Sequence, residues 1–324
     1  MISCPICDST DINFSFSSTD INYRLSSKLY QIYNCSNCSV FFQWPIPGEN
    51  EIKSFYSDEY NEHYESDKLR ATNKLKKVTK KIISYIISKN EEAYRENKFD
   101  NLVFSPFRFF FGNPSIELIQ GEIGKQEIRV LDVGCGAGVF LEKIARCTNV
   151  KYSLGCDFSK NAVDTCRRKG LNVLQGTIKD VEEKNFNVII LKHILEHVPN
   201  PYEFLFEIKK RITDDGILLI SLPNSDSIGR WIFRKYWAGF DVPRHIFTYN
   251  KKSLNFLLQK TGFEIIKCKY DLIFVNSINP LLGKLRHTDN FVNSYITQKF
   301  FLIISKIVGL VNYADQITLI ARKI

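Results

Sequence analysis

Residues 128–140 read IRVLDVGCGAGVF, and this stretch decides the fold. Its first part, Ile128–Val133, is dominated by apolar, mostly β-branched residues, which is typical of a strand buried in a parallel sheet. Gly134, Gly136 and Gly138 follow, and apolar residues then recur at helical spacing. A strand, a glycine-rich turn and a helix in this order let a ligand lie against bare backbone at the carboxyl end of the sheet.

The spacing of the glycines indicates which kind of nucleotide site this is. They read G-x-G-x-G, and Asp132 precedes them inside the strand. A dinucleotide fingerprint would read G-x-G-x-x-G and would carry no carboxylate at that point. The stretch resembles motif I of the class I S-adenosylmethionine (SAM) dependent methyltransferases. This resemblance implies an α/β fold, a Rossmann-like seven-stranded sheet with helices on both faces. For the glycines alone, a merely tight strand-to-helix turn is the alternative.

Composition and charge narrow the class of protein. The chain has 324 residues, of which 44% are hydrophobic and 13% aromatic, and this excludes a disordered protein. Its net charge of +9 suits an anionic partner, but we interpret most lysines as solvated surface. We find no apolar stretch near the roughly 20 residues that spanning a membrane needs. The N-terminus lacks a basic segment followed by an apolar one, so we expect no signal peptide and a cytoplasmic protein.

The nine cysteines fall into two populations. Cys4, Cys7, Cys35 and Cys38 form two C-x-x-C pairs, and the other five are scattered, which favours a reducing compartment over a disulfide framework. Two such pairs can place four thiolates around one structural Zn²⁺ in a small ribbon-like module, residues 1–50. A closed four-sulfur site has no open position, so it would stabilise the module without catalysing. Reduced cysteines without metal, or a redox pair, are the alternatives.

The rest of the chain divides into two further regions. We expect a helical linker or cap at residues 51–114, with a long helix over about 67–97 that carries an apolar stripe and a basic face. Residues 115–324 would form the SAM-binding domain, with a helical insertion at about 272–314. We interpret this insertion as part of the substrate pocket or a dimer face. The alternative is an interfacial helix at a membrane surface, touching a lipid-linked substrate.

A second carboxylate completes the predicted cofactor site. Asp157 ends the next predicted strand, about twenty residues past the glycines, where a carboxylate can accept hydrogen bonds from both ribose hydroxyls. Ser159 is the predicted N-cap of the following helix. The resemblance implies that the three glycines hold the methionine end of SAM and that Asp132 orients its ammonium group. It also implies cofactor contacts at Phe158, Thr177, Ile178 and Lys192, with Thr177 and Ile178 beside the adenine.

Two further motifs define the expected acceptor side. The segment 193–201, HILEHVPNP, resembles a signature that follows strand four in many of these enzymes. The segment 237–245 reads W-x-G-x-D-x-P-R-H and resembles an element of a bacterial subgroup that often carries the N-terminal cysteine pairs. We rank His245 first as general base, because histidine titrates near neutrality. His193 and His197 are the alternatives, and His197 fits a structural role better. Glu196 would orient a histidine or bind substrate, and Arg244 would hold an anionic or hydroxyl-rich acceptor.

The leading hypothesis is therefore a methyltransferase acting on oxygen or carbon of a small molecule. The family resemblance implies that the acceptor is a sugar, a nucleotide-sugar or a lipid-linked glycan precursor, as in polysaccharide biosynthesis. The alternatives are a zinc-containing RNA methyltransferase, a non-catalytic interaction protein on the same fold, and a nicotinamide oxidoreductase. Nucleic acid is the weaker choice of acceptor, because the chain has no Asn-Pro-Pro-Tyr motif. The sequence does not decide the oligomeric state.

Overall fold

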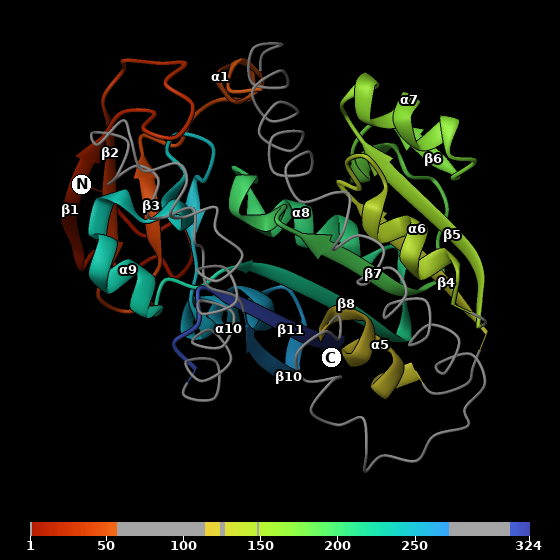
Figure 1. Cartoon of the computed structure of the whole chain (residues 1–324). Helices are drawn as coiled ribbons and strands as arrows, with labels where there is room; N and C mark the ends of the chain where they lie inside the picture. The colour runs from red at the N-terminus through yellow and green to blue at the C-terminus, as the bar shows by residue number, and fades with distance from the viewer. Residues whose placement is uncertain (1, 57–113, 124–126, 148, 272–311) are drawn as a thin grey trace, which may run out of the picture. The chain divides into compact units, whose positions relative to one another are not determined.

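The computed structural model describes residues 2–56, 114–123, 127–147, 149–271 and 312–324 (Figure 1). The helix expected over 67–97 and nearly all of the expected insertion at 272–314 lie outside these residues. Met1–Ile52 and Pro114–Ile324 belong to one compact unit. Among the helices described, none has the length and apolar character that crossing a membrane requires.

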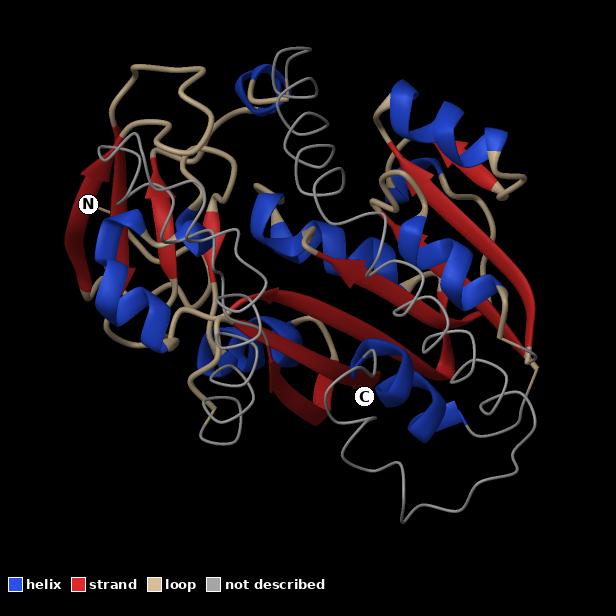
Figure 2. Cartoon of the chain, in the orientation of Figure 1, coloured by secondary structure: helices blue, strands red, loops and turns tan. Residues whose placement is uncertain are grey.

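The larger sheet of the described chain has seven strands, in the order β10-β11-β8-β7-β4-β5-β6 (Figure 2). In chain order they are β4 (Ile128–Val133), β5 (Val150–Asp157), β6 (Val173–Gln175), β7 (Phe186–Lys192), β8 (Ile212–Pro223), β10 (Phe263–Asp271) and β11 (Gln316–Lys323). Strands β4 to β8 pair in parallel, whereas β11 is antiparallel to both of its neighbours. The chain runs outward from β4 to β6 and then returns to the other side of β4 for β7. Such a reversal of strand order is where open α/β sheets bind ligands.

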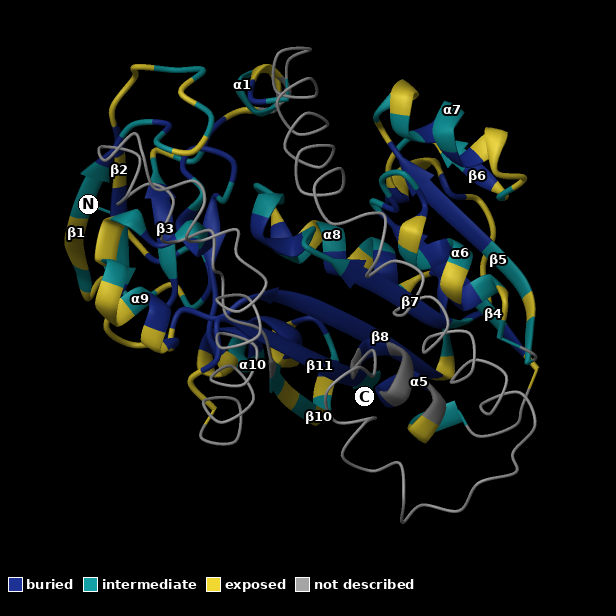
Figure 3. Ribbon diagram, viewed as in Figure 1, coloured by how far each residue is buried: buried dark blue, intermediate teal, exposed yellow. Residues whose placement is uncertain are grey.

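Helices cover both faces of this sheet, as the sequence predicts. The α-helices described are α1 (Glu49–Ser54), α5 (Pro114–Ile123), α6 (Val139–Ala145), α7 (Lys160–Arg168), α8 (Pro201–Lys209), α9 (Ile228–Phe233) and α10 (Lys251–Lys260). Short 3₁₀ helices are η1 (Ile178–Asp180), η2 (Leu195–His197), η3 (Arg234–Tyr236) and η4 (Ala238–Phe240). Residues of α8 and α10 share a core cluster with Leu131 of β4, and residues of α5 and α6 share another with Val130. Because adjacent strand residues point to opposite faces, the apolar run of β4 is buried on both sides. Figure 3 shows that most of β7 and β8 is buried as well.

Local capping signals explain where two of the helices begin. Ser159 precedes α7 and its hydroxyl accepts a hydrogen bond from the backbone N–H of Ala162 at 3.4 Å, which confirms the predicted N-cap. Helix α10 begins at Lys251. Asn250 and Ser253 form a reciprocal capping box there, because each side chain accepts a bond from the other's backbone N–H.

The N-terminal cysteine module contains a second, antiparallel sheet. Its strands β1 (Ile12–Ser18), β2 (Tyr30–Cys35) and β3 (Phe41–Trp44) come from the module, and β9 (Phe247–Thr248) comes from beyond β8. Strand β9 pairs with β3 in antiparallel register, and both Phe42 and Phe247 are buried. The module therefore takes its fourth strand from the domain that carries the expected active site.

Candidate active site

The glycine turn leaves an open backbone surface at the end of β4. Gly134, Gly136 and Gly138 have φ angles of 66°, 53° and 73°, which a side chain disfavours. An added Cβ at Gly134 would lie 2.0 Å from the Cδ1 of Ile194, so the turn packs directly against the segment that follows β7. An added Cβ at Gly136 would meet nothing within 4 Å. Gly136 therefore faces space that a ligand can occupy.

Asp157 lies against this turn, at the place its spacing predicts. Its Oδ2 accepts a hydrogen bond from the backbone N–H of Gly136 at 2.8 Å, and its Oδ1 accepts one from Ser159 at 2.9 Å. An ionised carboxylate has about four acceptor positions, so two remain for ligand hydroxyls. The neighbouring Phe158 has 57% of its surface exposed and can offer an aromatic face beside this carboxylate.

Asp132 is buried in β4, and its Oδ2 has no hydrogen-bond partner among the described residues. Burial raises the pKa of Asp132 to about 7, while the positive charge of Lys192 opposes the rise and the charge of Asp157 adds to it. Lys192 ends β7, with its Nζ 3.3 Å from the hydroxyl of Ser115. An unpaired buried acceptor is costly, so this site favours a ligand that brings a cation or a donor.

The two residues expected beside the adenine have different surroundings. Thr177 caps η1, because its backbone N–H and its hydroxyl both donate to Oδ2 of Asp180, at 2.7 and 2.9 Å. Ile178 is 2% exposed and belongs to the main core cluster. The expected contact between Ile178 and an adenine ring therefore has no exposed surface to use, since the 3₁₀ turn directs this side chain inward.

A buried carboxylate organises the histidines at the exit of β7. Glu196 is 1% exposed, and its Oε1 lies 3.1 Å from Nδ1 of His193. The His193 side chain is 41% exposed and has a left-handed backbone, with φ at 55°. Burial alone would raise the pKa of Glu196, but the hydrogen bond from His193 and the neighbouring imidazoles hold that pKa at about 2. Glu196 is therefore ionised, and it orients the exposed ring of His193.

His197 and His245 form a second pair beside Glu196. His197 donates from Nδ1 to the carbonyl of Arg244 at 3.0 Å, and His245 donates from Nδ1 to the carbonyl of Gly239 at 2.8 Å. The two rings meet edge to face, with centroids 4.7 Å apart. Burial, together with the charge of His245, lowers the pKa of His197 to about 4, so His197 is neutral near pH 7. The structure thus brings His193, His197 and His245 together around one carboxylate.

Arg244 lies elsewhere than expected. It is 1% exposed, and its guanidinium binds both oxygens of Asp20 and both oxygens of Asp241 at 2.7–3.1 Å. The ring of Tyr23 lies 4.3 Å from the guanidinium carbon. An arginine closed in this way has no surface for an acceptor, so the expected role of Arg244 in holding substrate is replaced by a structural one. Asp20 could not be identified from the sequence, because a lone aspartate in a polar segment carries no local signal.

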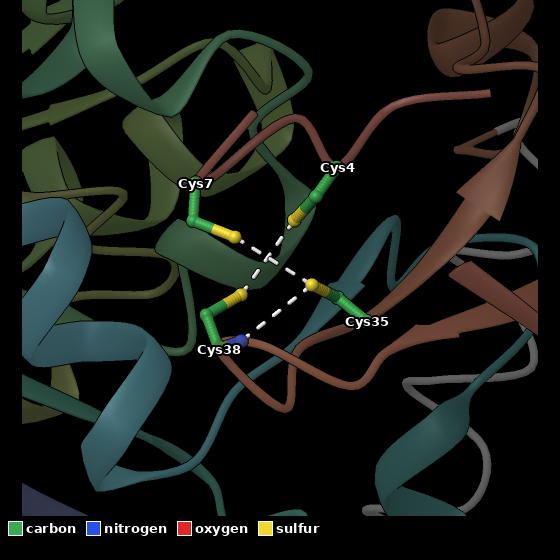
Figure 4. Close-up of side chains that lie close together, drawn as sticks. All are labelled: Cys4, Cys7, Cys35 and Cys38. Atoms are coloured by element: carbon green, nitrogen blue, oxygen red, sulfur yellow. Dashed lines mark hydrogen bonds between the residues drawn. The ribbon is translucent and has the colours of Figure 1, made fainter. Parts of the chain in front are cut away.

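The four predicted cysteines come together at one end of the module. Figure 4 shows the sulfurs of Cys4, Cys7, Cys35 and Cys38 directed toward a common centre, and all lie within 4.8 Å of one another. The closest pairs are Cys4 with Cys38 at 3.6 Å and Cys7 with Cys35 at 3.5 Å. A tetrahedral zinc with Zn–S bonds of about 2.3 Å needs sulfurs about 3.8 Å apart. The donor set and its spacing therefore fit one zinc ion.

Comparison with known proteins supports a methyltransferase domain. Residues 113–267 match a family model described as a methyltransferase domain. The chain is 23% identical over 223 residues to the mitochondrial ubiquinone biosynthesis O-methyltransferase of Dictyostelium discoideum, covering 56% of this chain and 69% of that protein. It is 29% identical over 158 residues to the ubiquinone biosynthesis O-methyltransferase of Rickettsia bellii (strain OSU 85-389), covering 44% and 64%. The alignment with the Saccharomyces cerevisiae protein of that name, at 34% identity, covers 35% and 39%.

Solved structures with a similar arrangement include two from other organisms. The cyclopropane synthase MmaA2 from Mycobacterium tuberculosis superposes with a TM-score of 0.44 at 17% identity, covering 64% of this chain and 82% of that one. A SAM-dependent methyltransferase from Archaeoglobus fulgidus superposes with a TM-score of 0.43 at 21% identity, covering 68% and 100%.

The buried Asp132 predicts a pH-dependent gain in stability for Asp132→Asn. Its folded pKa of about 7 exceeds the ordinary value of 3.8, so between these values the folded state holds a proton that the unfolded state has released. Stability then falls as pH rises from about 4 to 7, by at most about 4 kcal/mol. Asp132→Asn should raise the free energy of unfolding at pH 8 and change it little at pH 4, as measured by urea titration without cofactor.

Asp214→Asn is the control for this measurement. Its side chain is 98% exposed and pairs with Lys323 at the surface, so its substitution should change stability by less than about 0.5 kcal/mol at either pH. Equal effects of Asp132→Asn at both pH values would contradict the proposed burial of an acid.

Proposed function

We propose that this chain, which is a SAM-dependent methyltransferase, transfers the methyl group of SAM to an oxygen of a small-molecule acceptor. One observation carries the proposal: the open glycine turn, which is bonded to Asp157, packs through Ile194 against the segment that presents His193. Because β4 and β7 are adjacent parallel strands, a nucleotide site and a candidate base share one edge of the sheet. The named activity of the relatives supports oxygen as the atom methylated.

The cofactor side offers a complementary group for each part of SAM. The bare backbone at Gly136 would receive the methionine portion, and the unpaired oxygen of Asp132 would accept from its ammonium group. Asp157 would bind the ribose hydroxyls, and the exposed ring of Phe158 would lie against the adenine. Bound SAM supplies a methyl group already activated by its sulfonium, so the enzyme must fix the donor, align the acceptor and remove one proton.

We assign the proton removal to His193. Its Nδ1–H donates to Glu196, which fixes the tautomer and leaves the lone pair on Nε2 of a side chain that is 41% exposed. With SAM bound, the acceptor oxygen would displace the methyl carbon from the sulfonium sulfur, which would leave as S-adenosylhomocysteine. The acceptor proton would pass to this Nε2, and the ionised Glu196 would stabilise the imidazolium that forms. A positioned base of this kind contributes about 10²–10⁴ in rate. The sequence ranking, which placed His245 first, is therefore revised in this proposal.

The acceptor proposal also departs from the sequence expectation. A sugar or glycan acceptor has no support among the relatives above, whose names specify ubiquinone biosynthesis. We therefore propose a small hydroxyl compound of the aromatic or quinol type, by analogy with those names. A panel of phenols and alcohols, read by mass spectrometry for a gain of about 14 Da, separates this class from a sugar acceptor.

The cradle at Gly136 is tested by Gly136→Ala. The new Cβ would project into the proposed cofactor space and strain a backbone with φ at 53°, at a cost of about 1 kcal/mol. We expect a folded protein whose Kd for S-adenosylhomocysteine rises at least about tenfold by calorimetry. Gly170→Ala is the matched control, because its φ is 73°, its Cβ also meets nothing within 4 Å, and Gly170 lies outside the site. Unchanged affinity in Gly136→Ala would show that the ligand does not bind at this turn.

The base assignment is tested by His193→Ala and Glu196→Gln. Both variants should lower kcat, His193→Ala by about 10²–10⁴, while the affinity for S-adenosylhomocysteine stays unchanged. Glu196→Gln keeps the shape of the side chain and removes the charge that stabilises the imidazolium. Transfer of labelled methyl to the accepted phenol provides the measurement. A normal kcat for His193→Ala would return the role to His245.

We also propose that the four cysteines bind one structural zinc ion. The sulfur spacing supports this, and the backbone N–H of Ile6 donates to the Cys4 sulfur at 3.4 Å, as thiolate ligands often receive. Purified protein should contain one zinc per chain by elemental analysis. Cys38→Ser should lose it and lower the free energy of unfolding by several kcal/mol. Cys147→Ser, outside the cluster, should keep the zinc and the free energy of unfolding of the wild type. Wild-type protein that contains no zinc after growth with zinc would contradict the proposed site.

A further inference from the structure

We infer that Asp20, in the cysteine module, is a positioning residue for the histidines of the candidate active site. It holds Arg244, whose carbonyl accepts a hydrogen bond from His197, and the same turn supplies the Gly239 carbonyl that accepts one from His245. The inference builds on the proposed function, but its test reads the histidine rings themselves. The link matters because the module would then act on methyl transfer without touching cofactor or acceptor.

The first step is the anchoring of Asp20 within the module. Asp20 lies in the loop between β1 and β2, and its side chain is 1% exposed. Its Oδ1 accepts from the backbone N–H of Tyr23 and its Oδ2 from that of Leu25, both at 3.1 Å. These bonds fix the carboxylate within the loop. Strand β2 runs from this loop to Cys35, one of the proposed zinc ligands.

The second step is the closure of the guanidinium between two carboxylates. Asp20 accepts hydrogen bonds from the two terminal nitrogens of Arg244, at 2.7 and 3.1 Å. Asp241 accepts hydrogen bonds from Nε and one terminal nitrogen, both at 2.9 Å. Asn22, from the same module loop as Asp20, also donates to Asp241 at 2.6 Å. Arginine cannot lose its charge in a protein, so a buried guanidinium needs such partners. The charge of Asp20 therefore holds the loop 238–246 in place.

Backbone hydrogen bonds around Arg244 connect it to the rings of His197 and His245. The Arg244 carbonyl accepts from Nδ1 of His197, so displacing this backbone removes the partner of that ring. The backbone N–H groups of Arg244 and His245 both donate to the carbonyl of Asp241, at 2.8 and 3.1 Å. The same turn places the Gly239 carbonyl under Nδ1 of His245. One buried ion network thus determines the position of both imidazoles.

This arrangement has a spectroscopic signature. A carbonyl oxygen can only accept a hydrogen bond, so His197 and His245 must each carry hydrogen on Nδ1. Free histidine favours the other tautomer, with hydrogen on Nε2. The Nδ1–H form at these two positions therefore reports that the loop is held.

The experiment is a two-bond ¹H–¹⁵N correlation of histidine rings in the full chain. The protein has five histidines, so selective labelling gives few signals, and single His→Gln variants assign them. In the wild type we expect Nδ1–H at both positions. Asp20→Asn preserves the size of the side chain and removes its charge; it should shift both rings toward Nε2–H. Because a misplacement of about 1 Å can cost about 10² in rate, kcat should fall on that scale, while S-adenosylhomocysteine affinity stays unchanged.

Asp8→Asn is the control within the same module. Among the described residues, the Asp8 side chain forms an ion pair with Lys260 at the surface and is 82% exposed, so its substitution should leave both tautomers and kcat as they are. Nε2–H at His197 or His245 in the wild type would overturn the inference even if Asp20→Asn fails to fold. Unchanged tautomers in a folded Asp20→Asn would overturn it as well. If kcat proves independent of His193 but the tautomers follow Asp20, the proposed base fails and the positioning role stands.

Discussion

A buried guanidinium with two carboxylates is the constraint on which the rest of the site depends. Arg244 keeps its charge at any pH a protein meets, so burying it requires opposite charges at bonding distance. One of those charges, Asp20, stands 224 residues earlier in the chain than Arg244. The cysteine module and the loop 238–246 are consequently parts of one compact unit. The pairing of β3 with β9 is a second connection between the module and this part of the chain.

The two proposed halves of the site, one for the cofactor and one for the acceptor, are built by different physical means. The cofactor half depends on absent side chains, because Gly136 leaves room and its N–H fixes Asp157. The acceptor half depends on charged and polar side chains, because Glu196 stays ionised in a buried position only through the histidines around it. Ile194 packs against Gly134 and joins the two halves. A displacement of the segment that carries the histidines would therefore alter the packing at the glycine turn.

The sequence predicted those features that rest on local patterns. The apolar run of β4, the glycine turn, the position of Asp157 and the four cysteines all follow from spacing within short segments, and the structure places them as expected. The roles of Arg244 and Ile178 do not follow from spacing. The first depends on a distant aspartate, and the second on a 3₁₀ turn that directs the side chain inward. The two-residue strand β9 is likewise too short to leave a periodic signal.

The choice among the three histidines follows from what each ring's Nδ1 contacts. A base must become an imidazolium, and a carboxylate stabilises that cation more than a peptide carbonyl does. His193 has the carboxylate of Glu196 at its Nδ1, whereas His197 and His245 have carbonyls. Burial also disfavours the charged form of His197, and the pKa of this ring is lowered to about 4. We therefore propose His193 as the ring that takes the proton from the acceptor, with the other two rings packed beside its carboxylate.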